Sequence, residues 1–526
     1  MNGVRIEGLT VIGHDGPMVA PLDAAIEPGR TLAVIGESGS GKTLTAKALV
    51  GLLPRGFRAN GSMHIGSRAV GLDASDAEWR SVRGRTVTLL LQDPFTSLSP
   101  VHRCGDQIGW TLDAAAPRRL SRGERDQAVA EALAEVKLPS YVARSYPHQL
   151  SGGMRQRVAI AAALAADPEL IIADEPTTAL DASNQAEILD LLRSVQRARN
   201  LCVILISHDL GLVRGRTDHV LVMRHGEVVE RGATATVLAD PQHPYTRALI
   251  EADPTLAASS AAAGPGGMPD DDGAPLLRAR GVVKHFGERL VLDDVDLDVG
   301  SGKIVGVVGE SGSGKSTLAR CIAGLETEGS GEILFDGAPL APGRRSRTPG
   351  QMQIVFQDPY SSLNPMMSIG AILREALGVA GRPPGDVASL LATVGLPAEF
   401  ARKRPAELSG GQRQRVAIAR SLAPNPRLLI CDESVSALDV SVQAQILALL
   451  VRLRDELGIA ILFISHDLAV VRMLADTVAV LWQGRVVESG TCEQVLSEPR
   501  HEYTALLVAA ARRENPGVVV DAPGKD

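Results

Sequence analysis

Two glycine-rich stretches of this chain have the residue types and spacing that hold the phosphates of a nucleotide. They are Gly36-Glu37-Ser38-Gly39-Ser40-Gly41-Lys42-Thr43 and Gly309-Glu310-Ser311-Gly312-Ser313-Gly314-Lys315-Ser316. Both fit the G-x-x-x-x-G-K-[ST] phosphate loop, in which glycines let backbone N–H groups curl around phosphate oxygens. The lysine reaches the β- and γ-phosphates, and the last hydroxyl binds Mg²⁺. The helix that follows adds the positive end of its dipole.

The segments that flank each loop are those that the motif needs. Apolar, strand-like runs precede the loops at 31–35 and 304–308, and helix-like segments follow them at 44–52 and 317–325. A glycine-rich turn without a ligand is the alternative for a single copy. Two copies in matching strand–loop–helix contexts favour nucleotide binding.

Two acidic pairs and two serine-glycine segments add further chemistry. The pairs Asp174-Glu175 and Asp432-Glu433 each end an apolar strand, where a carboxylate can hold Mg²⁺ and the next one can polarise an attacking water. An acidic strand cap is the alternative. Ser151-Gly152-Gly153 and Ser409-Gly410-Gly411 each open a strongly helical segment. A serine there is an N-cap beside exposed amides, which makes either a second anion site or a capping motif alone.

The chain is a tandem duplication. Ser151 and Ser409 are separated by 409 − 151 = 258 positions, and the same separation joins the two acidic pairs, His208 with His466, and His243 with His501. The two loop lysines are 315 − 42 = 273 positions apart, so the first half carries extra residues between its loop and its serine-glycine segment. Strands alternate with helices after that segment, which predicts an α/β fold with a parallel sheet.

The predicted boundaries follow from this repeat. We expect a first domain at 1–256, a flexible linker at 257–275, a second domain at 276–515 and a disordered tail at 516–526. The linker is rich in alanine, glycine and proline. Its run Asp270-Asp271-Asp272 is more typical of a solvated spacer than of a metal site.

Composition excludes several classes of protein. Of 526 residues, 45% are hydrophobic, which is enough for real cores, and the net charge of −7 gives no basic signature for nucleic acid. The five cysteines are far apart, so we expect reduced thiols. The N-terminus has no signal-peptide core, and no run of about 18 apolar residues could span a bilayer. Any membrane function would then need another chain.

These motifs together resemble the ATP-binding cassette (ABC) ATPases, over nearly the whole chain and twice. The resemblance implies two tandem P-loop NTPase domains, each with a RecA-like core, an antiparallel β subdomain and a helical subdomain. It also implies that two cassettes pack head to tail, with each ATP between the phosphate loop of one and the serine-glycine segment of the other. The expected cofactors are ATP and Mg²⁺.

The resemblance assigns roles to residues at matching positions. Glu175 and Glu433 would be catalytic bases, and His208 and His466 would contact the γ-phosphate. One ATP site would join Lys42, Thr43, Gln92, Asp174, Glu175 and His208 to Ser409 and Gly411. The other would join Lys315, Ser316, Gln357, Asp432, Glu433 and His466 to Ser151 and Gly153. Thr43, Gln92, Asp174, Ser316, Gln357 and Asp432 would hold Mg²⁺, and the glutamines would report to a membrane partner. Asp181 and Asp439 would communicate across the dimer. Because both bases are intact, we expect both sites to hydrolyse ATP.

One position departs from the family pattern. An aromatic residue upstream of the phosphate loop stacks on adenine in this family, and Phe286 fits that place in the second half. The equivalent in the first half is Gly13, with His14 beside it. We therefore expect weaker adenine stacking in the first site.

Two further features resemble the oligopeptide/dipeptide/nickel importer group. They are the glutamine loops, at 92–100 and 357–365, and the segments His243-Pro244-Tyr245-Thr246 and His501-Glu502-Tyr503-Thr504. This resemblance implies a translocase ATPase, peripheral on the cytoplasmic face of the cell membrane. Its partners would be two integral-membrane permeases and, through them, an extracytoplasmic binding protein. No cysteine lies in 249–277, so no iron–sulfur cluster is expected.

The substrate is left open between peptides, which we favour, and nickel, a metal chelate or glutathione. A different class is a soluble twin-cassette ATPase acting on ribosomes. Such proteins usually have a long charged helical linker, and residues 257–275 are not a linker of that kind. The zinc-bearing DNA-repair relatives need cysteine pairs, and the cysteines of this chain are far apart. In fused sugar importers the second cassette is commonly degenerate, whereas both cassettes here are complete.

Overall fold

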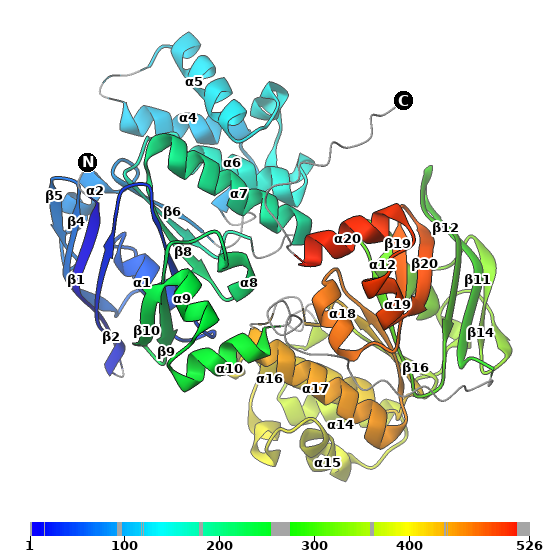
Figure 1. The fold of residues 1–526 in the computed structure, drawn as a ribbon. Coiled ribbons are helices and arrows are strands. Elements are labelled where there is room, and N and C mark those ends of the chain that lie inside the picture. Colours follow the sequence, from blue (N-terminus) through cyan, green and yellow to red (C-terminus); the bar gives the residue numbers. More distant parts are fainter. Residues whose placement is uncertain are drawn as a thin grey trace. The chain divides into compact units, whose positions relative to one another are not determined.

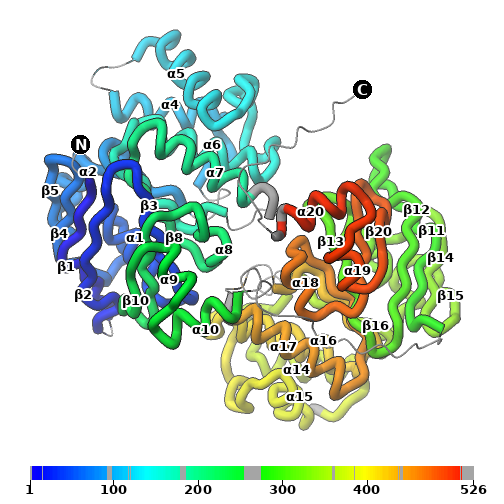
Figure 2. Tube along the Cα trace, in the orientation of Figure 1, coloured from blue at the N-terminus to red at the C-terminus, as the bar shows by residue number. Residues whose placement is uncertain are grey.

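The computed structural model describes residues 3–14, 16–91, 97–116, 118, 120–177, 182–253, 274–357, 362–435, 438 and 440–512. By its contacts the chain divides into two compact units, Met1–Leu256 and Ala257–Asp526. Both units have the same succession of strands, with similar but not identical helices between them (Figure 1, Figure 2). The predicted linker, except for residues 274 and 275, and the predicted tail lie outside the described residues.

The described elements of the first unit begin with a β-rich part, continue through helices and end with strands that alternate with helices. They are β1 Val4–Gly13, β2 Gly16–Ile26, β3 Thr31–Ile35, α1 Lys42–Ala48, β4 Arg58–Ile65, β5 Arg68–Gly71, α2 Asp76–Val82, β6 Val87–Leu90, α4 Cys104–Ala115, α5 Arg122–Glu135, η1 Ser140–Arg144, η2 Pro147–Gln149, α6 Gly152–Leu164, β7 Leu170–Asp174, α7 Ala182–Arg199, β8 Cys202–Ser207, α8 Leu210–Val213, β9 His219–Arg224, β10 Glu227–Ala233, α9 Thr234–Ala239 and α10 Pro244–Ala252.

The second unit repeats this order of strands, with the 3-10 helix η3 in the place of α2 and an additional 3-10 helix, η4. Its described elements are β11 Leu277–Phe286, β12 Arg289–Val299, β13 Ile304–Val308, α12 Lys315–Ile322, β14 Ser330–Phe335, β15 Ala338–Leu340, η3 Arg344–Ser346, β16 Met352–Val355, α14 Ile369–Val379, η4 Pro384–Asp386, α15 Val387–Thr393, η5 Ala398–Arg402, η6 Pro405–Glu407, α16 Gly410–Leu422, β17 Leu428–Asp432, α17 Val440–Leu457, β18 Ala460–Ile464, α18 Leu468–Leu474, β19 Thr477–Trp482, β20 Arg485–Thr491, α19 Cys492–Ser497 and α20 Glu502–Arg512.

In the described residues, each unit contains a six-stranded sheet and a four-stranded sheet. The larger sheets have the orders β10-β9-β3-β8-β7-β6 and β16-β17-β18-β13-β19-β20, and among their described strands only β10 and β20 pair antiparallel to their neighbours. The smaller sheets, β2-β1-β4-β5 and β12-β11-β14-β15, are antiparallel. Every residue of β3 and β13 is buried, which explains the continuous apolar runs before the loops.

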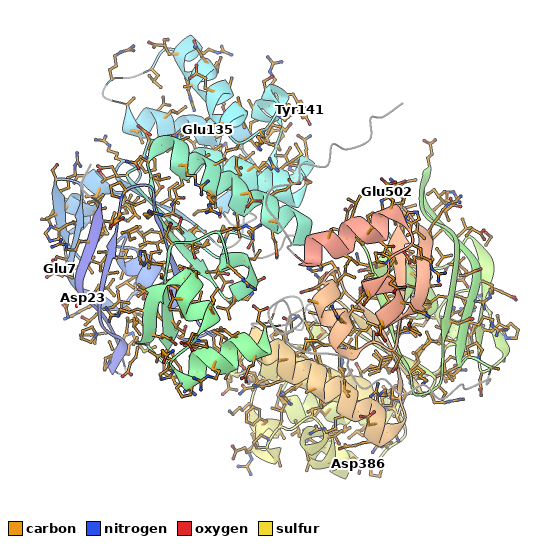
Figure 3. All side chains as sticks on the ribbon, in the orientation of Figure 1. Glu7, Asp23, Glu135, Tyr141, Asp386 and Glu502 are labelled. Atoms are coloured by element: carbon orange, nitrogen blue, oxygen red, sulfur yellow. The ribbon has the colours of Figure 1, made fainter. Side chains whose placement is uncertain are left out.

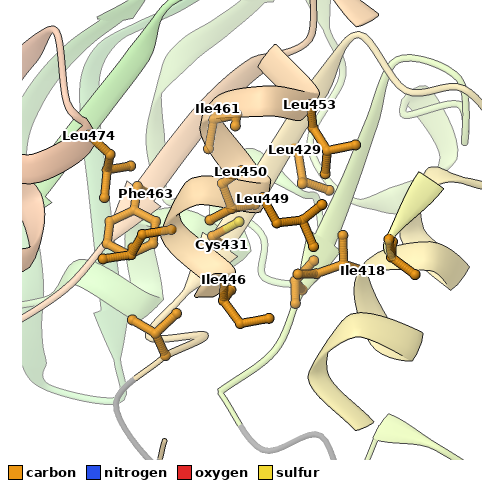
Figure 4. Packing of buried hydrophobic residues seen from close by; sticks show 14 of the residues in the cluster. Ile418, Leu429, Cys431, Ile446, Leu449, Leu450, Leu453, Ile461, Phe463 and Leu474 are labelled. Carbon is orange, nitrogen blue, oxygen red and sulfur yellow. The ribbon is translucent and has the colours of Figure 1, made fainter. Parts of the chain in front are cut away.

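The core of the second unit shows how the helices fix the sheet. In α17 the buried residues Ile446, Leu450 and Leu453 recur at helical spacing. They pack with Phe463 of β18 and Cys431 of β17 in one cluster (Figure 4). Burying a side chain of this size contributes about 1.5–3 kcal/mol, so these contacts hold the strand ends in fixed positions.

No helix among the described residues is long and apolar enough to cross a membrane.

Candidate nucleotide sites

Each phosphate loop begins with a glycine that no other residue can replace. Gly36 has φ +148°, and a Cβ there would lie 2.2 Å from the carbonyl oxygen of Met223. Gly309 has φ +154°, and its Cβ would lie 2.1 Å from the carbonyl oxygen of Leu481. The loop therefore passes directly against the end of the neighbouring strand, β9 or β19, and needs glycine to do so.

The loop lysines are buried, and each donates hydrogen bonds to its own loop. The Nζ of Lys42 donates to the carbonyl oxygens of Gly36 and Glu37, at 2.6 and 2.8 Å. The Nζ of Lys315 donates to the matching carbonyls of Gly309 and Glu310, both at 2.7 Å. Carbonyl oxygens orient an ammonium group without neutralising its charge. The positive charge therefore stays within the loop, where phosphates would need it.

A hydroxyl and a carboxylate meet beside each loop. The Oγ1 of Thr43 lies 3.4 Å from Oδ1 of Asp174, a long contact, and the Oγ of Ser316 lies 2.8 Å from Oδ1 of Asp432. Burial, aided by the charge of Glu175, raises the pKa of Asp174 to about 6. Burial also raises the pKa of Asp432. Hydroxyl and carboxylate oxygens are the donors that Mg²⁺ prefers, so these pairs fit that ion.

The glutamates after β7 and β17 are held in a strained backbone conformation. Glu175 and Glu433 have φ +47° and +48°, which a non-glycine residue seldom adopts. Each donates its N–H to the adjacent strand, to the carbonyl oxygens of Ile206 and Ile464, both at 3.0 Å. The same strain in both units indicates that the turn aims the carboxylates in one direction, as is common at active sites.

Each glutamate pairs with a histidine. Nδ1 of His208 lies 3.1 Å from Oε1 of Glu175, and Nδ1 of His466 lies 3.4 Å from Oε1 of Glu433. Burial acts to lower the pKa of each histidine, but the contact with the glutamate outweighs it and raises the pKa. In the second unit Nε2 of Gln357 donates to the other oxygen of Glu433, at 2.8 Å.

The topology brings these groups to one edge of each sheet. In the orders β3-β8-β7 and β13-β18-β17, the loop, the histidine and the acidic pair follow three successive strands. The carboxyl ends of parallel strands are where α/β proteins bind ligands. Of the predicted residues, Gln92, Asp181 and Asp439 lie outside the described part of the chain.

The serine-glycine segments are N-caps. Ser151 and Ser409 are exposed, and their hydroxyls accept the N–H of Met154 and Gln412 at 3.3 Å. Gln412 also accepts the N–H of Ser409, at 3.0 Å, which completes a capping box. Methionine at position 154 cannot make this second bond. Gly411 is buried and has no room for a side chain, since a Cβ would lie 2.2 Å from Val442.

Ser409→Ala is expected to lower the free energy of unfolding by about 1 kcal/mol, because it removes the oxygen that caps the helix. Chemical denaturation of the full chain measures this. Ser409→Gly is the control, since glycine at an N-cap costs only about a few tenths of a kcal/mol. Equal losses in the two variants would contradict a capping role for the hydroxyl.

The two units differ around the predicted adenine position. Phe286 is 47% exposed at the end of β11, with the Nζ of Lys284 4.8 Å from its ring centre. In the first unit a Cβ on Gly13 would lie 3.1 Å from the ring of Phe57, and that ring contacts His14 edge to face. Phe57 thus lies beside the place that an aromatic residue would occupy, but on another segment.

We expect a fluorescent ATP analogue to bind about fivefold more tightly to Lys42→Ala than to Lys315→Ala. The first variant keeps the site with Phe286, and base–aromatic stacking contributes about 1–3 kcal/mol in nucleic-acid binding. Fluorescence titration measures both affinities. Adding Phe286→Ala to Lys42→Ala should remove the difference, and equal affinities in the two lysine variants would refute the asymmetry.

A further contact involves Tyr245 and Tyr503. In the sequence these tyrosines served only as part of the segments that resemble the oligopeptide/dipeptide/nickel importer group. The hydroxyls of Tyr245 and Tyr503 accept the N–H groups of Glu37 and Glu310, both at 3.0 Å. The available signal was that the two tyrosines are 503 − 245 = 258 positions apart, the separation that also joins the other repeated motifs. The five cysteines are free, and no cluster of three or more metal-ligating residues occurs in the part of the chain that the structure describes.

Two α/β cores, each with a phosphate loop and an acidic pair at one sheet edge, define a P-loop nucleoside triphosphatase. Residues 19–178 and 292–436 match the ABC transporter family, and 229–272 and 487–520 match the C-terminal region of oligopeptide/dipeptide transporters. The first match covers more than half of the chain. The chain therefore belongs to the ABC transporter family, and the predicted family and fold class are confirmed.

Relatives match over nearly the full length. The glutathione import ATP-binding protein GsiA of Shigella sonnei is 42% identical over 94% of this chain and 86% of the relative. The protein of that name from Salmonella choleraesuis is 41% identical over 98% and 90%. A solved structure of cbiO1 from Clostridium perfringens, part of an ABC transporter complex, is 31% identical over 43% of this chain and 92% of its own, with a TM-score of 0.40.

The family places this chain among ATP-binding, ATP-hydrolysing subunits of the oligopeptide/dipeptide transporter group, as the sequence predicted. Such subunits work with membrane permeases.

Proposed function

We propose that this chain energises an importer of short peptides by hydrolysing ATP. The observation that carries the proposal is the repeated oligopeptide/dipeptide transporter C-terminal region, which is present in both units. The relatives are glutathione import ATP-binding proteins. Glutathione is itself a short peptide, so it is one candidate substrate within this class.

The site residues divide the work of phosphoryl transfer. Lys42 and Lys315, with the N–H groups of their loops, hold the phosphates, and catalysis consists mainly of positioning and charge neutralisation. Glu175 and Glu433 accept the proton of the attacking water. Their histidine partners, whose pKa the glutamates raise, are suited to contact the γ-phosphate. ATP would lie with its adenine toward Phe286 in the second unit.

The Mg²⁺ that accompanies ATP would be held by Thr43 and Asp174 in the first unit and by Ser316 and Asp432 in the second. A bound Mg²⁺ neutralises phosphate charge. Gln357, which contacts Glu433, and Gln92, by its matching position, would connect this group to the membrane partner. We further propose that Ser409 and Gly411 complete the Lys42 site, and that Ser151 and Gly153 complete the Lys315 site.

The proposed assembly has two integral-membrane permeases, with this chain on their cytoplasmic face and a binding protein delivering the substrate from outside. Purification of the tagged chain from membranes should recover the permeases. In proteoliposomes, ATP hydrolysis should rise when the binding protein carries a di- or oligopeptide or glutathione. Stimulation by nickel alone, or recovery of ribosomes in place of permeases, would overturn the proposal.

A further inference from the structure

The C-terminal extension of each unit contacts the phosphate loop through one tyrosine. The hydroxyl of Tyr245 accepts the N–H of Glu37, and that of Tyr503 accepts the N–H of Glu310, in each case at 3.0 Å. These partners are 208 and 193 residues apart in sequence. The same bond to the second loop residue therefore forms independently in both units.

Each tyrosine is held in place by hydrogen bonds of the segment around it. The Nδ1 of His243 accepts the N–H of Tyr245 at 3.1 Å, and the carboxylate of Glu230 accepts the N–H of His243 at 3.1 Å and that of Gln242 at 2.8 Å. This explains why α10 begins at Pro244, with His243 as its N-cap. The turn before α10 is thus fixed to β10.

The second unit repeats these bonds. Nδ1 of His501 accepts the N–H of Tyr503 at 3.1 Å, and Glu488 accepts the N–H groups of Arg500 and His501 at 2.9 and 3.0 Å. The segment before α20 is therefore fixed to β20 in the same way.

Both rings are packed as well as hydrogen-bonded. Tyr245 and Tyr503 are each 7% exposed. Tyr245 shares a buried cluster with Ile35, which precedes the loop, and the guanidinium of Arg224 lies 4.8 Å from its ring centre. Tyr503 stacks on Trp482, with ring centres 5.2 Å apart. The hydroxyls have little freedom to leave the loops.

The same extension also reaches the segment that follows the active-site histidine. In the first unit Oδ2 of the buried Asp253, just after α10, accepts the N–H of Gly211 at 3.2 Å, and Leu249 packs with Leu210 of α8. In the second unit α20 packs on α18. Figure 1 shows α10 and α20 as the last helices of their units. The extension therefore contacts both the loop and the element behind the histidine.

We propose that Tyr245 and Tyr503 are positioning residues for the nucleotide. Each ties down the N–H of the second loop residue, so the loop keeps the conformation in which its later N–H groups and its lysine face the phosphates. Preorganisation of this kind improves affinity because the ligand need not order the loop on binding. The inference rests on the proposed nucleotide sites.

The test uses the full chain with one site removed. In Lys315→Ala, where the Lys42 site remains, adding Tyr245→Phe should weaken binding of a fluorescent ATP analogue about three- to tenfold, the effect of losing one hydrogen bond. Phenylalanine keeps the ring in its packing. In Lys42→Ala, Tyr503→Phe should do the same. Tyr141→Phe, at a 62% exposed tyrosine of η1, is the matched control (Figure 3).

The outcomes are distinct. If Lys42→Ala/Lys315→Ala still binds the analogue, the proposed sites themselves are wrong. If that variant does not bind and Tyr245→Phe leaves the affinity unchanged, only the present inference is overturned. A lower melting temperature without any change in affinity would likewise overturn it, because it would make the tyrosine purely structural. Weaker binding with an unchanged melting temperature is the supporting result.

Discussion

The double variant Glu175→Gln/Glu433→Gln is expected to lower the rate of ATP hydrolysis at least about a hundredfold and to leave ATP binding intact. Loss of a general base typically costs 10²–10⁴-fold, and glutamine cannot accept the proton. Glutamine keeps the shape of the side chain, and it leaves in place the backbone N–H bonds to Ile206 and Ile464 at the turn with φ +47° and +48°. In the proposed site the phosphates are bound by other groups, the loop lysines and N–H groups.

Phosphate release measures the rate, and a fluorescent ATP analogue measures binding. Each single variant should keep the activity of the other site, because both units have a complete set of groups. Glu227→Gln, at an exposed glutamate of β10, is the control and should behave as the unaltered chain. Retained ATP hydrolysis in the double variant would show that Glu175 and Glu433 are not the catalytic bases.

Much of this arrangement could be predicted from the sequence because it depends on local chemistry. The glycine spacing in each loop follows from positive φ angles and from the close approach of the next strand at Gly36 and Gly309. The buried runs at β3 and β13 are apolar because parallel strands are covered on both faces. Ser151 and Ser409 are predictable as N-caps because capping is a property of one residue and its neighbours.

Contacts between distant segments could not be predicted in this way. Nothing in a single sequence states that Tyr245 reaches Glu37, 208 residues away. The pairing of His208 with Glu175 depends on β8 lying beside β7, which only the sheet order provides. The strained turn at Glu175 is likewise a product of tertiary structure, since local preference alone disfavours it.

The two units share one fold, but several of their matching side chains differ. Gln412 completes a capping box that Met154 cannot, and the hydroxyl–carboxylate contact is 2.8 Å in the second unit and 3.4 Å in the first. Phe286 has no equivalent at Gly13, although Phe57 lies nearby. These differences fall on groups that we assign to ATP. We therefore expect the two sites to differ in their affinity for ATP, whereas the mechanism of hydrolysis should be the same.

Ser409→Arg and Ser151→Arg are expected to have opposite effects in a chain that retains one active base. In Glu433→Gln, the remaining hydrolysis should come from the Lys42 site, which we propose is completed by Ser409. Adding Ser409→Arg should therefore lower the remaining rate on the order of a hundredfold, as loss of a transition-state donor does. Adding Ser151→Arg should leave it nearly unchanged, and in Glu175→Gln the two effects should be exchanged.

This comparison is internally matched, because both serines are exposed N-caps and each arginine removes one cap of about 1 kcal/mol. Damage to folding would thus appear equally in both variants and in both backgrounds, and thermal unfolding checks that it does. Only the assignment of each serine to the other unit's lysine predicts the exchange. If Ser151→Arg instead silences the Lys42 site, each unit completes its own site, and the head-to-tail arrangement is wrong for this chain.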